Sequence, residues 1–276
     1  MPVWIMARVT FREAVRKKIV WMALAGGCAF LILFATALHF QVANFNARHV
    51  TPFLQKQIVS GLLMVGLYAI DLLAVVMAVL TSVDTLSGEI ASGTIQAIAT
   101  KPVRRWELLI GKWLGFAAML TLYLAILVGG INTITLLMTH VAAKHPIRGF
   151  SLMWMEILLL LSVTFFFGTL LSTLTNGVLV LGLHGLAFIG GWIEQAGALT
   201  KTPKAVDVGV IASLLMPSET LWRRAVYEMQ SPLTTALNFT PFSGVSVPSV
   251  AMIGYAALYA MAFLGLAIWR LEKRDL

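Results

Sequence analysis

The chain is short of charged residues. Only 12% of its 276 residues are Asp, Glu, Lys or Arg, whereas 59% are hydrophobic, and the mean hydropathy is +0.88. Soluble domains carry roughly 25% charged residues. This deficit excludes an ordinary soluble domain and indicates an integral membrane protein.

Cysteine is almost missing, because Cys28 is the only one. An intramolecular disulfide is therefore excluded. The histidines lack the spacing of a shared metal site, and Met153 and Met155 have no Cys or His close by in sequence to complete a copper site. We predict no metal site and no cofactor bound by this chain.

A nucleotide-binding loop is also missing. Residues 88–94 have the glycine spacing of a Walker A loop, but Thr94 stands where the phosphate-contacting lysine should be. Gly111 and Lys112 lack the upstream glycine that such a loop needs, and Trp113 follows them. The sequence does not bring together a nucleophile, a base and an orienting group either. The chain is therefore predicted not to be an enzyme by itself.

Long apolar runs make up most of the chain. At about 20 residues per crossing, six spans are expected, over residues 19–40, 58–83, 114–138, 152–174, 178–192 or slightly beyond, and 250–269. No large soluble domain is left over. We expect an all-α polytopic membrane protein in which residues 1–276 form a single transmembrane domain.

The cations predict the orientation of the spans, because Lys and Arg near short loops are retained in the cytoplasm. Twelve of the 20 cations precede the first span, lie between the second and third, or follow the last. Both termini and the loop between spans two and three are therefore expected to be cytoplasmic. The cations are dispersed along membrane edges, which argues against nucleic-acid binding.

Two of the remaining segments are predicted to be helical. Residues 1–18 form an imperfect amphipathic pattern, with Trp4, Ala7 and Phe11 on the apolar stripe, as expected of a helix in the inner interface. Residues 196–249 form a longer external segment, in which Pro217 starts an amphipathic or re-entrant helix with Arg223 on its polar face. This segment is a candidate contact for an extracytoplasmic partner.

Residues 84–112 form an elbow between the second and third spans and carry the most informative pattern. A short helix is expected to begin near Thr94 and to stop at Lys101, because a residue before proline is biased out of helical geometry. Pro102 then opens a second helix that runs into the third span. A rigid lever of this kind is suited to receiving a push from a cytoplasmic partner.

This elbow resembles that of the type-2 ABC exporter permeases, in which the segment between spans two and three reads as an acid, then Gly-Thr, then Pro, Arg and Lys. The six-span layout, the interfacial N-terminal helix and the enlarged segment before the last span also agree. The chain further looks like the branch linked to maturation of multicopper enzymes. The matching elbow positions, with Arg104 beside them, are Glu89, Gly93, Thr94, Pro102, Arg105, Leu109 and Lys112.

The resemblance implies a permease subunit of an ATP-driven exporter in the bacterial inner membrane. It implies that the elbow holds a coupling helix seated in a groove of a separate ATP-binding cassette subunit, present in two copies, which binds ATP and Mg. It also implies a second permease copy, in a homodimer or pseudo-dimer within the lipid, around a central path.

Ionisable and polar residues inside spans are candidates for that path, because burying them in lipid is costly. Asp71 lies near the middle of the second run, Asn132 lies in the third and His184 in the fifth. The alternative is that they hydrogen-bond neighbouring helices and hold the bundle together. Glu156 and Glu194 are expected close enough to the outer edge to reach water.

Two other classes of function stay open. One is a secondary transporter or channel driven by an ion gradient through Asp71, for which internal inverted symmetry would be expected. The other is a membrane scaffold that moves no solute. The nature of the substrate is not set by the sequence.

Overall fold

The computed structural model of the protein describes residues 2–91, 104–230 and 247–273. Every regular element within these ranges is an α-helix, so the all-α class is confirmed. The helices are α1 (Pro2–Arg16), α2 (Lys18–Ala47), α3 (Pro52–Ala91), α5 (Arg105–Thr139), α6 (Pro146–Gly168), α7 (Thr173–Thr200), α8 (Pro203–Leu215), α9 (Ser218–Met229) and α11 (Val250–Lys273).

Six of these helices are long and apolar enough to cross a bilayer, which confirms the expected number of spans: α2, α3, α5, α6, α7 and α11. The fourth span ends at Gly168, earlier than expected. The chain turns there, since the hydroxyl of Thr169 donates to the carbonyl of Phe166 at 2.7 Å. Leu174, which was expected at the end of the fourth span, belongs to α7.

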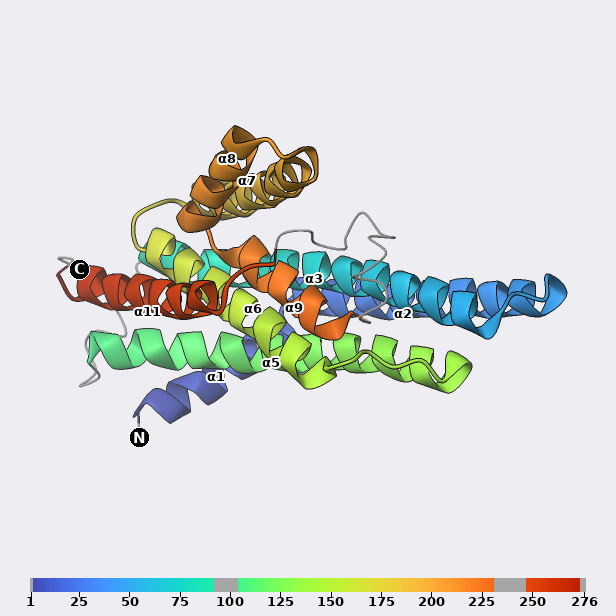
Figure 1. The fold of residues 1–276 in the computed structure, drawn as a ribbon. Coiled ribbons are helices and arrows are strands. Elements are labelled where there is room, and N and C mark those ends of the chain that lie inside the picture. The colour runs from blue at the N-terminus through green and yellow to red at the C-terminus, as the bar shows by residue number, and fades with distance from the viewer. Residues whose placement is uncertain (1, 92–103, 231–246, 274–276) are drawn as a thin grey trace.

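Helices α3 and α5 are much longer than a bilayer is thick. They have 40 and 35 residues, which at 1.5 Å per residue gives about 60 and about 52 Å, against a hydrocarbon core of about 30 Å. Residues 92–103, with most of the predicted elbow, lie outside the described residues. The described ends of α3 and α5 that flank them lie at the same end of the bundle as the start of α1 and the end of α11 (Figure 1).

Helix α1 packs against α5 through two glycines. A Cβ on Gly111 would lie 2.5 Å from the Cβ of Met6, and a Cβ on Gly115 would lie 2.7 Å from the carbonyl oxygen of Ala7. Only glycine allows this approach, which is the small-xxx-small packing of membrane helices. The predicted N-terminal helix is present and buries Ala7, but its Trp4 side chain is 76% exposed.

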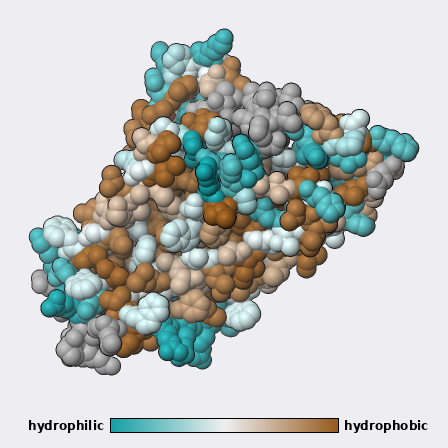
Figure 2. Space-filling view, turned by 60° about the horizontal axis from the view of Figure 1, so that its bottom comes forward, coloured by the Kyte–Doolittle hydropathy of each residue, from teal (hydrophilic) through white to brown (hydrophobic). Residues whose placement is uncertain are grey.

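The core lies between α3, α5 and α6. Ile70 and Ala74 of α3, Leu124 of α5 and Leu160 of α6 are all fully buried. By contrast, α2 and α11 leave most of their apolar surface exposed. Hydrophobic residues accordingly cover much of the molecular face in Figure 2, as expected of a surface that meets lipid or another membrane subunit.

The segment before the last span folds back on the bundle. Helix α8 lies against α7, where Gly190 and Gly209 allow close contact, and a bend of 106° separates α8 from α9 (Figure 1). Helix α9 begins at Ser218, as the Pro217 signal predicts, and packs on α6. The apolar side of α9 is buried as expected, but so is Arg223, which was expected on the polar side.

Candidate functional site

The structure describes only part of the predicted coupling elbow. Gly93, Thr94 and Pro102 lie outside the described residues, and of Glu89 only the backbone is described, within α3. Arg104 precedes α5, and its backbone N–H donates to Oε2 of Glu107 at 3.1 Å. The coupling role of these residues stays a prediction.

Arg105 joins two helices. Its Nη1 donates to the carbonyl oxygens of Leu271 and Glu272, 3.3 Å away in each case. These carbonyls belong to the last turns of α11, where a cation also complements the helix dipole. The start of α5 is therefore tied to the end of the last span, a contact that the sequence did not reveal.

Lys112 is placed differently from the other cations of the elbow. Its side chain is only 3% exposed, and it stands between Gly111 and Gly115, the two glycines on which α1 packs. Lys112 is thus buried next to the face of α5 on which α1 packs. Its part in coupling to the ATP-binding subunit stays a prediction.

A polar cluster lies inside the membrane-spanning part, between α3, α6, α7 and α9. Asp71 of α3 is 5% exposed and Glu156 of α6 is fully buried, and their carboxyl groups interact electrostatically. The Nδ1 atom of His184 lies 3.9 Å from Oε1 of Glu156 and 3.0 Å from Oγ of Ser218. Asp71 is 19 residues from the start of α3 and 17 from the end of its apolar stretch at Gly88. The cluster is therefore close to the middle of that span.

Helix α9 contributes two further ionisable groups. Glu219, 5% exposed, interacts electrostatically with Asp71 and lies against Gly191, where an added Cβ would be 2.8 Å from its Cγ. Arg223 donates to Oε2 of Glu194 at 2.8 Å, and both side chains of this ion pair are buried. The bend between α8 and α9 thus brings ionisable groups of this bent helix pair into the bundle.

A cavity of about 380 Å³ opens beside this cluster. Its polar groups come from Asp71, His184 and Glu219, and aromatic rings come from Tyr68 and Phe188. Apolar residues of α3 and α7 complete the wall. A mostly apolar cavity with a few convergent polar groups is the usual form of a small-molecule site.

Of the three residues predicted to line a transport path, the structure places Asp71 and His184 at the same cavity. Asn132 is not among the residues of that cavity, and its side-chain amide donates to the carbonyl of Val128 on its own helix at 2.8 Å. Its role in a path stays a prediction without support from this cluster.

Sequence reasoning placed Glu156 and Glu194 near water, and the structure corrects this. Glu156 lies in the middle of α6, which begins at Pro146, and is fully buried, while Glu194 is paired with Arg223. Glu219 was missed as a site residue. The available signal was the pairing of Glu219 and Arg223 at i and i+4 within a short helix next to a membrane span.

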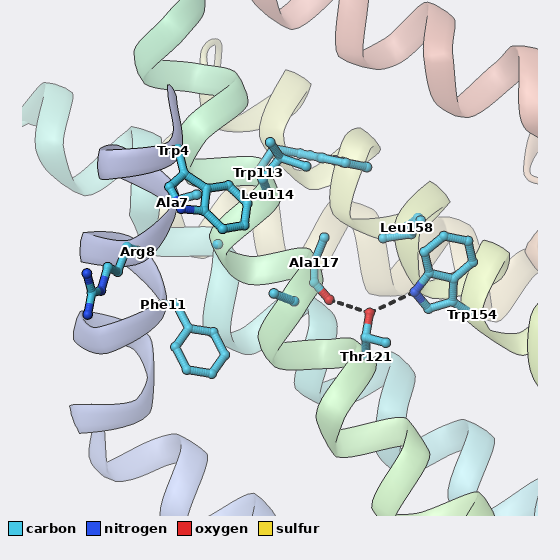
Figure 3. Close-up of a pocket in the computed structure, with 12 residues that line it drawn as sticks. Trp4, Ala7, Arg8, Phe11, Trp113, Leu114, Ala117, Thr121, Trp154 and Leu158 are labelled. Carbon is cyan, nitrogen blue, oxygen red and sulfur yellow. Dashed lines mark hydrogen bonds between the residues drawn. The ribbon is translucent and has the colours of Figure 1, made fainter. Parts of the chain in front are cut away.

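A larger groove of about 670 Å³ lies between α1, α5 and α6. It is lined mainly by apolar and aromatic side chains, including Trp4, Phe11 and Trp113 (Figure 3). Its polar contact is a chain in which Trp154 donates to the hydroxyl of Thr121 at 2.7 Å and that hydroxyl donates to the carbonyl of Ala117. This groove offers mainly apolar contact, and Arg8 is the ionisable residue among the described residues that line it.

The six long apolar helices define a multi-pass membrane protein. The family model for the ABC-2 family transporter protein matches residues 4–276, and the chain therefore belongs to this family of ABC transporter permeases. No curated protein matches the chain. Membership of the family implies a partner ATP-binding cassette subunit that uses ATP and Mg. Among the residues that the structure describes, no three His, Cys, Asp or Glu side chains are arranged to hold a metal ion.

Proposed function

We propose that the chain is the membrane subunit of an ATP-driven exporter, and that residues 84–112 receive force from the separate ATP-binding subunit. The observation that carries this proposal is the continuity of α3 and α5, which flank this segment and extend through the bilayer. Asp71 lies halfway along α3. A displacement at the elbow is thereby passed along a helix to the polar cluster.

The contacts of α5 support movement as a unit. The glycine packing attaches α1 to α5 through Gly111 and Gly115, and Arg105 attaches α11. Movement of α3 relative to α6 and α7 shifts Asp71 relative to Glu156 and His184. Such a shift changes access to the cavity, which makes this cluster the candidate switch of the transport path.

A second permease copy belongs to the proposed assembly. The cavity reaches the surface at α3, where Leu72, which lines it, is 54% exposed. Packing of the same face of a second copy covers this side chain and places the cavities of both copies on a shared central path. We propose a homodimer with two ATP-binding subunits in a bacterial inner membrane, with both termini cytoplasmic and residues 196–249 open to an extracytoplasmic partner.

The test follows the reactivity of one position. Leu72→Cys, in a Cys28→Ala background, is reconstituted with the ATP-binding subunit, and its reaction rate with a maleimide is compared with and without ATP. A rate that changes with ATP in the complex, but not for the permease alone, supports the proposal. Equal rates in all conditions contradict it.

An ion-gradient-driven transporter is the second candidate function. It is favoured by the two buried carboxyl groups of Asp71 and Glu156, which interact with each other and receive no N–H or hydroxyl donor at Oδ1 of Asp71 or at either oxygen of Glu156 within the described part of the chain. This candidate predicts transport by the purified permease under an ion gradient, with no ATP-binding subunit. A scaffold that moves no solute predicts neither activity. A role in multicopper-enzyme maturation stays a prediction.

A further inference from the structure

We propose that the cavity beside Asp71 and Glu219 binds an organic cation, a substituted ammonium group, as the substrate class of the transport path. This inference rests on the proposed function for the claim that the ligand is transported. The binding itself is a property of this chain alone. It is supported by the acidic side chains at the cavity, by carboxyl oxygens without an N–H or hydroxyl donor, and by the aromatic wall.

Acidic side chains outnumber basic ones at the cavity, because Asp71 and Glu219 line it and, among the described residues, no Lys or Arg does. Asp71, Glu156 and Glu219 interact with one another electrostatically. Arg223, the guanidinium that acts on Glu219, already donates to Glu194 at 2.8 Å. When ionised, the three carboxyl groups therefore have no full counter-charge of their own among the described residues. A buried carboxylate without a counter-charge is costly, and a bound cation offsets that cost.

Carboxyl oxygens without an N–H or hydroxyl donor lie at the cavity, on Asp71, and beside it, on Glu156. Asp71 lines the cavity, and only 5% of its surface is exposed. Its Oδ1, like both carboxyl oxygens of Glu156, receives no hydrogen bond from an N–H or hydroxyl group of the described residues, and the two carboxyl groups lie within hydrogen-bonding reach of each other. Buried polar atoms are nearly always satisfied by a donor, and each exception calls for a missing partner. An ammonium group supplies the charge that these oxygens lack and, where it bears N–H groups, the donors too.

The aromatic wall favours an organic cation over a bare metal ion. Tyr68 and Phe188 line the cavity with their ring centroids 6.0 Å apart, and Trp222 lies 5.4 Å from Tyr68. Aromatic faces attract substituted ammonium groups through the ring quadrupole. Metal ions instead require several converging ligand atoms, and no group of three such side chains occurs in the part of the chain described.

The size of the cavity agrees with a small organic ligand. Its volume of about 380 Å³ falls within the roughly 300–1,000 Å³ of small-molecule sites. Its apolar wall, formed by residues such as Leu72 and Val75, suits the hydrocarbon part of such a ligand. The site therefore combines a charged end with an apolar body.

The test uses benzyltrimethylammonium, which is permanently cationic, and the full chain in lipid nanodiscs without the ATP-binding subunit. Binding is measured by isothermal titration calorimetry for the wild type, Asp71→Asn and Glu219→Gln, and Asp207→Asn serves as the control because its carboxylate is exposed on α8. We expect each cavity variant to weaken binding by at least about tenfold, since a desolvated charge partner is lost. The control should bind like the wild type.

A second pair of variants tests the site even if Asp71→Asn or Glu219→Gln fails to fold. Phe188→Leu removes the ring but keeps an apolar wall, and Phe188→Tyr restores a ring. Weaker binding in the first and recovery in the second support the site. The inference is overturned if the wild type does not bind the ligand at millimolar concentration. It is also overturned if Phe188→Leu and whichever of Asp71→Asn and Glu219→Gln folds bind it as tightly as the wild type.

The outcome is separable from that of the proposed function. Ligand binding without any ATP-dependent change at Leu72→Cys leaves the cation site standing and rejects ATP coupling. An ATP-dependent change at that cysteine without cation binding rejects the substrate class and leaves the coupling standing.

Discussion

The Nη1 atom of Arg105 lies 3.3 Å from the carbonyl oxygen of Leu271, although the two residues are 166 positions apart in the chain. This contact connects the first turn of α5 to the last turns of α11 at the end of the bundle where α1 begins. The third span, the last span and the N-terminal helix are thus joined beside residues 92–103. A force applied there acts on three helices at once.

Arg105→Gln should uncouple ATP hydrolysis from the change at the cavity. The substitution removes the charge-assisted contact with α11 but leaves α5 intact. We expect ATP hydrolysis by the copurified complex to persist, while the ATP-dependent labelling of Leu72→Cys falls several-fold, in line with about 0.5–2 kcal/mol of lost coupling. Arg12→Gln, an exposed cation of α1, is the control and should behave like the wild type. Unchanged labelling in Arg105→Gln would remove this contact from the mechanism.

Gly115→Leu should destabilise the protein by separating α1 from α5. A Cβ at this position already lies 2.7 Å from the carbonyl oxygen of Ala7, and forced overpacking costs about 1–3 kcal/mol. The midpoint of thermal unfolding in detergent should fall by several degrees. Gly129→Leu on the same helix is the matched control, because a Cβ at that position would meet no neighbouring atom within 4 Å. Equal midpoints for both variants would contradict the packing described.

Arg223→Met should be strongly destabilising because it breaks the buried ion pair between Arg223 and Glu194 from one side. Breaking a buried ion pair from one side costs about 3–5 kcal/mol, whereas replacing both partners by apolar groups costs much less. The double variant Arg223→Met, Glu194→Met should therefore recover part of the loss in unfolding experiments. Arg148→Ala is the control: its side chain is 70% exposed in its ion pair with Glu228, and such pairs contribute about 0–1 kcal/mol. If the losses of stability in the two single variants simply add up in the double variant, the two side chains do not act as a pair.

The orientation expected from the cations is tested by labelling. In a Cys28→Ala background, a membrane-impermeant maleimide applied to whole cells should react with Lys204→Cys, at the start of α8, and not with Arg12→Cys on α1. Arg12→Cys should become reactive only after the membrane is permeabilised. The reverse pattern would place the elbow outside the cell and exclude contact with a cytoplasmic ATPase.

The spans were predictable from the sequence because each is a long apolar run whose helical state is dictated by the bilayer. The start of α9 was predictable too, because Pro217 is a local signal for a helix start. Helix ends were less predictable: α3 extends to Ala91 and α6 stops at Gly168, since hydrogen bonds in the turn, and not hydropathy, decide where a helix ends.

The site was only half predictable. Asp71 and His184 stood out because each is polar within an apolar run, yet their neighbourhood depends on how helices far apart in the chain pack. The burial of Glu156 reflects the face of α6 that meets α3, and the burial of Arg223 reflects the 106° bend that directs α9 back into the bundle. The burial of Lys112 could not be predicted for the same reason, because the packing of α1 is a tertiary contact with no local signature beyond the glycines.

The most direct test of the central claim is a crosslink between the elbow and the ATP-binding subunit. With Cys28 replaced by Ala, single cysteines are introduced at Thr94 and at Lys204, and the copurified complex is treated with a short thiol-to-amine crosslinker. The account predicts a crosslinked permease–ATPase product for Thr94→Cys, and the yield of this product should change when ATP is added. It predicts no such product for Lys204→Cys. A complex that copurifies intact but yields its crosslink only at Lys204→Cys would contradict it.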